Sequence, residues 1–218
     1  MVEEARIDRE MARISEKVLA MGRECVEAVR KTSAAFSSLN REEAHAIVER
    51  DHSIDENYKD IEHDTFRVLL LDHPVARDFR EIGSALKVIT DLERIGDYCV
   101  DIATEIEEFP NEPLNAAAEI LTRMGECVAT MVEKAIWAWE KKDVSAARSL
   151  AEDDDRVDGY FAKAKQTFID ILRIRDNIYA DQMIVFMMVA KYWERIGDHA
   201  VNIGEWVDYS LTGSHKMS

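Results

Sequence analysis

An all-helical fold made of two tandem three-helix bundles is predicted by three features of this sequence. Only 3 Pro and 8 Gly interrupt 218 residues, and 47% of the residues are hydrophobic, which favours long helices around a buried core. Charged residues make up 33% of the chain, a share typical of helices with one solvated face. The third feature is an internal repeat, which places the same set of helices twice in the chain.

The internal repeat extends through almost the whole sequence. Adding 103 to a residue number aligns Asp51 with Asp154. After a two-residue deletion the offset becomes 101, and residues 93–97, Glu-Arg-Ile-Gly-Asp, align with the identical residues 194–198. The deletion falls between the second and third predicted helices, where a loop tolerates it. We predict a first repeat at 1–109, a linker at 110–113 and a second repeat at 114–218.

Capping signals set the ends of the predicted helices. Asn40 and its counterpart Asp143 are good N-cap residues, so each is predicted to start a second helix. Pro74 suits the first turn of a helix, so a third helix is predicted to begin there. Residues 110–113, Pro-Asn-Glu-Pro, form the break between the repeats. The six predicted helices span residues 4–38, 41–71, 74–108, 113–140, 143–174 and 180–211. Short loops between helices of this length predict antiparallel bundles.

Net charge and cysteine content narrow the classes of function. With 28 Lys+Arg against 44 Asp+Glu, the formal net charge is -16, which repels nucleic acid and anionic membranes. The acidic excess serves either solubility or cation binding. Cys25, Cys99 and Cys127 show no zinc-binding spacing, which is typical of reduced thiols in a cytosolic protein. No signal peptide or apolar stretch of ~20 residues is present, so we expect a cytoplasmic protein without membrane insertion.

Several acidic residues lie on the apolar faces of the predicted helices. At 100° per residue, Glu93 and Asp97 fall within one apolar stripe, and Glu194 and Asp198 fall within the corresponding stripe of the sixth helix. The corresponding acids of the second and fifth helices are Asp51, Asp55, Asp154 and Asp158. A buried, unpaired carboxylate costs several kcal/mol, so each must be protonated, paired with a cation or bound to a metal.

Three explanations of these acids stay open, and metal binding is favoured by their spacing. Carboxylates four residues apart on a helix converge on one cation, and oxygen-only ligands suit hard ions such as Mg, Mn and iron. Asp101 extends the first set, whereas Asn202 stands at the matching position of the second. Ion pairs are the second explanation, although Arg94 and Arg195 point about 100° away from the adjacent Glu, so pairing would have to come from another helix. A wet bundle edge is the third.

No motif for enzyme chemistry stands out. The sequence contains no recognisable nucleophile with its base, no Gly-rich phosphate loop and no His-Glu-x-x-His. We therefore expect no enzyme. The alternatives are a carboxylate-bridged multinuclear metalloenzyme, in which bridged metals activate water or oxygen, and a helical scaffold without metal.

Three segments carry a resemblance to a known family. They are residues 73–80 (His-Pro-Val-Ala-Arg-Asp-Phe-Arg), residues 91–97 (Asp-Leu-Glu-Arg-Ile-Gly-Asp) and residues 192–199 (Tyr-Trp-Glu-Arg-Ile-Gly-Asp-His). With its duplicated Glu/Asp-x-x-x-Asp motifs, the chain resembles the PhoU family over its whole length. The resemblance implies a pseudo-twofold relation between the bundles and a multinuclear metal cluster in each. Iron is the first expectation, with Mn, Mg, Zn or Ni as alternatives. The implied metal ligands are Asp51, Asp55, Glu93, Asp97 and Asp101 in the first repeat, and Asp154, Asp158, Glu194 and Asp198 in the second.

The resemblance also implies a role. PhoU proteins are negative regulators of the phosphate-starvation response and restrain phosphate uptake, as adaptors between the phosphate ABC transporter and its sensor histidine kinase. The implied partners are the transporter ATPase subunit and that kinase, which would bring the chain to the inner membrane as a peripheral protein. Trp206 and Tyr209, expected on an exposed face, leave a homodimer open. Because Asn202 replaces an acid, the two metal sites are expected to differ.

Overall fold

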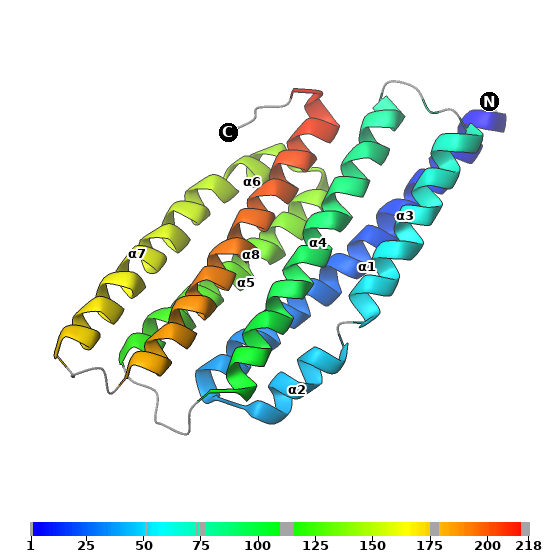
Figure 1. Ribbon diagram of the computed structural model, residues 1–218. Coiled ribbons are helices and arrows are strands. Elements are labelled where there is room, and N and C mark those ends of the chain that lie inside the picture. Colours follow the sequence, from blue (N-terminus) through cyan, green and yellow to red (C-terminus); the bar gives the residue numbers. More distant parts are fainter. Residues whose placement is uncertain are drawn as a thin grey trace.

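The computed structural model describes residues 2–50, 52–72, 74, 77–109, 116–174 and 179–214. Within these ranges the chain forms eight α-helices and no strand, so the predicted all-helical fold is confirmed. The helices are α1 (Val2–Ser38), α2 (Arg41–Arg50), α3 (His52–Asp72), α4 (Arg77–Glu107), α5 (Ala116–Lys141), α6 (Val144–Arg148), α7 (Leu150–Ile174) and α8 (Ala180–Thr212). The first repeat contains α1 to α4, and the second contains α5 to α8 (Figure 1).

Each repeat has one helix more than predicted. The helices predicted at 41–71 and 143–174 are each divided, into α2 and α3 and into α6 and α7. In the second repeat the division lies at Ser149, next to a close contact with α8. A Cβ added to Gly204 of α8 would lie 2.9 Å from the carbonyl oxygen of Ala147, so the glycine lets the end of α6 approach α8. No local Pro or Gly marks this division in the sequence.

The predicted caps are confirmed, whereas one predicted helix start is wrong. Asn40 Oδ1 accepts a hydrogen bond from the backbone N–H three residues later at 3.1 Å, and Asp143 Oδ1 accepts the equivalent bond at 3.0 Å. The third predicted helix begins at Arg77 and not at Pro74. Its first turn carries Asp78, a carboxylate that stabilises the positive end of the helix dipole.

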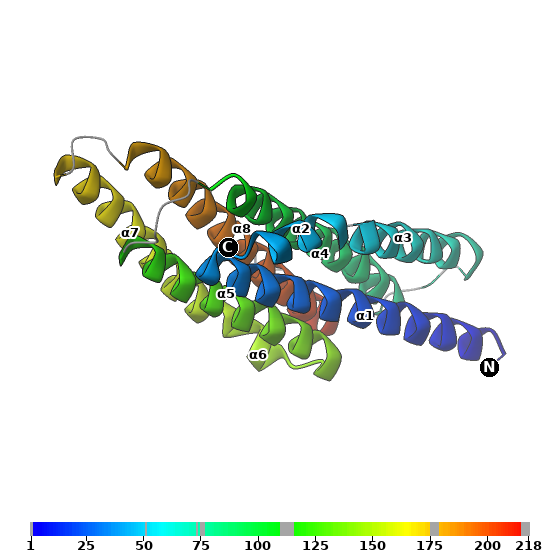
Figure 2. The ribbon, with the colours of Figure 1, turned by 90° about the horizontal axis from the view of Figure 1, so that it is seen from below.

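The two repeats pack through equivalent helices. Helix α1 contacts α5, and α4 contacts α8, so each inner helix lies against its own counterpart. The outer helices α3 and α7 lie at opposite sides of the molecule (Figures 1 and 2). Leu39 and Lys142, which are 103 residues apart, both adopt a positive φ in the turns before the caps. These pairings give the pseudo-twofold relation that the family resemblance implied.

A buried aromatic cluster joins the repeats at one end of the bundle. Phe186 of α8 is fully buried, and its ring centroid lies 6.0 Å from that of Phe36, 5.4 Å from that of Phe109 and 5.9 Å from that of Phe168. Phe36 and Phe109 belong to the first repeat, and Phe168 belongs to the second. One side chain therefore packs against both halves of the fold.

Trp206 and Tyr209 are half-buried, which corrects their expected position on an exposed face. Their rings meet edge to face at a centroid distance of 5.9 Å, and the amine of Lys87 lies 5.8 Å from the Trp206 ring. These contacts account for both side chains within one chain, so the homodimer stays a prediction. Among the helices described, none combines the length and the hydropathy needed to cross a membrane.

Candidate metal centres

Three carboxylates of the first repeat lie close together between α3 and α4. Asp55 belongs to α3, whereas Glu93 and Asp97 face it from successive turns of α4. One carboxylate oxygen from each residue lies within 4.8 Å of the other two. The side chain of Glu93 is 23% exposed and that of Asp97 is 35% exposed. The acids thus lie at the partly accessible edge of the bundle, which agrees with a wet bundle edge, the third explanation.

The guanidinium of Arg94 offsets part of this negative charge. Its Nε lies 3.3 Å from Glu93 Oε2, and its Nη1 donates to Asp97 Oδ2 at 2.8 Å. The charges of Glu93 and Asp97 raise the pKa of Arg94. The prediction that ion pairing would have to come from another helix is therefore wrong, because the long side chain reaches both neighbours along α4. Arg94 thus pairs with two of the three clustered carboxylates.

The other two predicted ligands of the first site are Asp51 and Asp101. Asp51 lies outside the described residues. Asp101 lies one turn beyond Asp97 and is not among the three clustered carboxylates. Burial, followed by repulsion from Asp97, raises the pKa of Asp101, and burial followed by the charge of Asp101 raises the pKa of Tyr192 on α8. Asp101 thus interacts both with the cluster and with the neighbouring helix of the second repeat.

The acids of the second repeat gather around Asp154 of α7. Burial, followed by the charges of Asp158, Asp198, Asp155 and Glu194, raises the pKa of the Asp154 carboxyl to about 6. Asp158 itself is exposed. Within the described ranges, only the first repeat brings three possible metal-ligand residues within 4.8 Å of one another. The second group of acids is therefore electrostatically connected but more widely spaced.

Cations of α8 pair with the second group of acids. Lys191 donates to Glu194, and Arg195 Nη1 lies 3.4 Å from Asp198 Oδ2. Arg195 corresponds to Arg94, but the counterpart of Lys191 is Thr90, which carries no charge. Lys191 thus adds a cation on α8 at a position where α4 carries none. Ion pairing, the second explanation of the acids, is present in both repeats.

Gly197 lets the two acidic helices of the second repeat approach each other. A Cβ at this position would lie 3.3 Å from Asp154 Oδ1 and 3.6 Å from Cγ1 of Val157. The glycine therefore makes room for a helix contact and for a carboxylate at the same time. This explains why a glycine stands between the Glu and the Asp of the repeated string.

Asn202 belongs to a polar cluster between the repeats that sequence analysis missed. Its Nδ2 donates to Asp91 Oδ1 at 3.2 Å, and Nδ1 of His199 lies 2.8 Å from the same oxygen. At the position related by the repeat, Tyr192 replaces Asp91, and its ring stacks on that of Tyr98 at 5.9 Å. At the offset of 101, Asp91 aligns with Tyr192 and Tyr98 aligns with His199. These two differences between the repeats were the only sign of the polar cluster in the sequence. Asn202 therefore holds α8 against α4.

The raised pKa of Asp154 predicts a pH effect on the metal-free protein. The folded chain keeps this proton at pH values between the ordinary 3.8 and about 6, where the unfolded chain has lost it. Stability contributed by this group therefore falls as the pH rises through that window. Asp154→Asn is expected to remove this part of the fall and to be more stable than the parent chain at neutral pH.

Urea unfolding in chelator at stepwise pH measures this effect as the difference between the parent and Asp154→Asn. Glu152→Gln, a change at an exposed acid of the same helix whose charge does not contribute to the raised pKa of Asp154, is the matched control and is expected to show no such difference. A parent-minus-Asn difference in the free energy of unfolding that stays constant from pH 4 to pH 7 would contradict the prediction.

Comparison with protein families gives the same result twice along the chain. A family model described as PhoU domain matches residues 18–106 and again residues 121–207, which together exceed half of the chain. The chain belongs to the PhoU family. The resemblance drawn from the repeated motifs is thus confirmed, as is the duplication. The boundaries of the PhoU repeats at 109 and 114 stay a prediction.

Relatives and solved structures extend this likeness over the full length. The chain is 30% identical over 209 residues to the phosphate-specific transport system accessory protein PhoU homolog of Clostridium acetobutylicum, covering 94% of each. It is 33% identical to the homolog of Xylella fastidiosa strain 9a5c, covering 96% of this chain and 88% of that protein. The crystal structure of the phosphate transport system regulatory protein PhoU from Streptococcus pneumoniae superposes with a TM-score of 0.90 at 26% identity, covering 97% of this chain and 100% of that one. PhoU from Pseudomonas aeruginosa gives 0.90 at 27% identity, covering 95% and 99%.

Proposed function

We propose that this chain is a regulatory accessory protein of a phosphate-specific transport system and acts as a metal-binding adaptor without enzymatic activity. The observation that carries the proposal is the full-length relationship to proteins named phosphate-specific transport system accessory protein. A solved relative with the same fold is named a phosphate transport system regulatory protein. In the proposed role the chain represses the phosphate-starvation response and restrains uptake when phosphate is plentiful.

The metal-binding part of the proposal rests on the acidic clusters. In the first repeat Asp55, Glu93 and Asp97 would hold the ion, and their oxygen ligands and excess negative charge suit a hard divalent or trivalent cation such as iron, Mn or Mg. In the second repeat the residues would be Asp154, Asp158, Glu194 and Asp198. A bound cation would neutralise the repelling carboxylates and link the helices that carry them. Arg94 would limit the charge when no ion is present.

The second repeat is proposed to bind metal more weakly than the first. Lys191 pairs with Glu194 and must give up that contact before the carboxylate can bind an ion, whereas the corresponding residue of the first repeat, Thr90, carries no charge. Asp158 is also exposed, which adds mobility to one of the ligands. The expected difference between the sites is thus assigned to Lys191 and Asp158, and Asn202 is assigned to the contact between the repeats.

The adaptor role is proposed for the outer surface of the bundle. The partners are the ATPase subunit of the phosphate transporter and a phosphate-sensing histidine kinase, reached from the cytoplasm. The names accessory and regulatory, given to the relatives, support a contact with the transport system rather than a reaction carried out by the chain itself. An acidic protein with clusters half-exposed at its edge offers a charged surface to such partners.

Affinity purification tests the adaptor role. The tagged chain is produced with the ATPase subunit and the kinase from its own genome, in cells grown at high or low phosphate. Both partners are expected to be recovered at high phosphate, and a tagged helical bundle of similar net charge serves as the control. If neither the ATPase subunit nor the kinase is recovered at high phosphate, although the chain itself is folded, the adaptor role is contradicted.

A further inference from the structure

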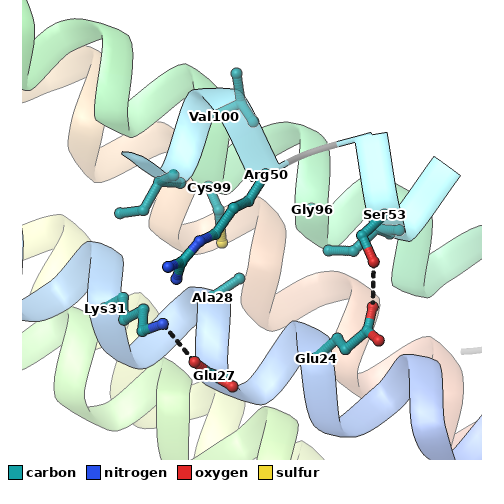
Figure 3. Close-up of a pocket in the computed structure, with 11 residues that line it drawn as sticks. Glu24, Glu27, Ala28, Lys31, Arg50, Ser53, Gly96, Cys99 and Val100 are labelled. Atoms are coloured by element: carbon teal, nitrogen blue, oxygen red, sulfur yellow. Dashed lines mark hydrogen bonds and ion pairs between the residues drawn. The ribbon is translucent and has the colours of Figure 1, made fainter. Parts of the chain in front are cut away.

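A pocket opens in the first repeat between α1, α4, the last turn of α2 and the first turn of α3. Its volume is about 220 Å³, and none of the three clustered carboxylates lines it. The deeper wall is mostly apolar and includes Ile47, Ile54 and Cys99, which are all buried. Charged side chains stand at the mouth, where Arg50 extends from the end of α2 towards Ala28 and Lys31 of α1 (Figure 3). The pocket therefore combines an apolar interior with a charged entrance.

The second repeat shows what fills the equivalent space. The counterpart of Ala28 is Met131, which is 1% exposed. Its Cε would lie 3.8 Å from a Cβ added to Gly197, the counterpart of Gly96, which lines the pocket in the first repeat. One side chain thus occupies in the second repeat the volume that the first repeat leaves open. The same fold accommodates a large side chain at this position in the second repeat. The pocket of the first repeat is therefore due to the small side chain of Ala28.

The charged residues at the pocket entrance also differ between the two repeats. In the second repeat Lys134 donates to Asp153 Oδ2 at 2.7 Å, which forms an ion pair at the equivalent position. The counterparts are Lys31 and Arg50, so the acid of the pair is replaced by a second cation. Lys31 turns to Glu27 on its own helix. Within the described part of the chain, Arg50 forms no hydrogen bond or ion pair, although it lines the pocket.

The acids at the entrance have partners other than Arg50. Glu24 Oε2 accepts hydrogen bonds from the Ser53 hydroxyl at 3.1 Å and from Asn57 Nδ2 at 2.9 Å, as Figure 3 shows for the serine. Glu27 is bonded to Lys31. Among the described residues that line the entrance, Arg50 is thus the charged side chain without a hydrogen bond or ion pair, and its exposed guanidinium is accessible to a ligand.

We propose that this pocket binds a small amphiphile with one anionic head, a carboxylate or a phosphate, and a short apolar body. The head would lie on Arg50, whose planar donors match both groups, while the body would occupy the space that Met131 fills in the second repeat. A cavity of about 150 Å³ is enough to hold benzene in a protein core, so this volume accommodates a short alkyl chain or a ring. The proposal does not depend on the role in phosphate transport.

Direct binding of simple probes to the full chain tests the proposal. Octanoate and octyl phosphate are titrated by calorimetry, with octylamine as the cationic analogue. At least one of the anions is expected to bind at about 1 mM or tighter, and octylamine is expected to bind more weakly than either. Comparing the two anions tells which head group the entrance prefers. Failure of both anions to bind, or equal binding of octylamine, would overturn the proposal.

Two variants copied from the second repeat locate the binding. Ala28→Met fills the interior, and Arg50→Asp restores the acid that pairs with the lysine; each is expected to weaken anion binding by at least about tenfold. The matched controls are Ala34→Met on the exposed side of α1 and Arg173→Asp at the end of α7, and neither is expected to change affinity. Thermal unfolding checks that each variant folds. Unchanged affinity in a folded Ala28→Met or Arg50→Asp chain places the binding elsewhere and would refute the assignment.

Discussion

Replacing Glu93 by Gln and Asp97 by Asn together is expected to abolish the stabilisation that divalent metal gives to the first repeat. An ion at 100 times its dissociation constant stabilises a folded chain by about 2.7 kcal/mol, which raises the thermal midpoint by roughly 5–10 °C for a protein of this size. The parent chain should show such a rise when Mn²⁺ or Fe²⁺ replaces chelator. In the double variant the three-carboxylate cluster of the first repeat retains one charged ligand, Asp55. The variant should therefore show only the smaller rise in thermal midpoint that the second repeat contributes.

The same variant separates metal binding from a scaffold held by ion pairs. If metal is the reason for the acids, the metal-free double variant should be at least as stable as the metal-free parent, since repulsion among carboxylates has been removed. If the pairs with Arg94 stabilise the fold, the metal-free variant should be clearly less stable than the parent. Glu119→Gln with Glu133→Gln, two exposed acids outside both clusters, is the control for the charge change. An undiminished response of Glu93→Gln/Asp97→Asn to metal would exclude the first cluster as the site.

Phe186→Ala is expected to destabilise the whole chain by about 3–5 kcal/mol, the range measured for removing a buried aromatic ring. The side chain is fully buried against rings of both repeats, so its loss leaves a cavity between them. The thermal midpoint should fall by roughly 6–20 °C in a single transition. Ile184→Ala on the same helix is the control, because its side chain is 64% exposed and its truncation should cost within about 0.5 kcal/mol.

Separate transitions for the two repeats in the parent chain would contradict the joint core that Phe186 forms. A fall in the free energy of unfolding of less than about 1 kcal/mol in Phe186→Ala would also contradict it, since the cavity left by a buried phenylalanine ring costs more. Urea unfolding followed by both fluorescence and circular dichroism measures the free energy and tests whether the probes coincide.

Much of the fold could be predicted from the sequence because the repeat and the caps are local signals. Asn40 and Asp143 act as the predicted N-caps, and each starts the helical region predicted there, although both regions are divided into two helices. The division at Ser149 could not be predicted, because it depends on a contact with Gly204 of a distant helix. Short-range patterns give the extent of a helix, whereas its interruptions depend on which residues meet in the folded chain.

The candidate site shows the same limit. Angular placement correctly put Asp55, Glu93 and Asp97 on facing helices, since a helix fixes the direction of each Cβ. It could not show that the flexible Arg94 reaches two acids on its own helix. It also could not show that Asn202, the counterpart of Asp101, contacts Asp91 in the other repeat.

The pocket was beyond the reach of sequence analysis for a related reason. The change from Met131 to Ala28 is visible in the aligned repeats, but whether it leaves a cavity depends on how the surrounding helices pack. Only the structure shows that Cys99, Ile47 and Ile54 do not close over the missing side chain. Comparing equivalent positions of the two repeats in the structure thus shows which residue changes leave a cavity.

Metal content is the most direct test of the acidic clusters as binding sites. The chain is purified without chelator, its divalent metals are quantified, and crystals are examined for anomalous scattering at the corresponding absorption edges. We expect at least one equivalent of metal per chain, with the strongest anomalous peak beside Asp55, Glu93 and Asp97. Less than one equivalent of any divalent metal, together with a thermal midpoint that chelation leaves unchanged, would contradict the account.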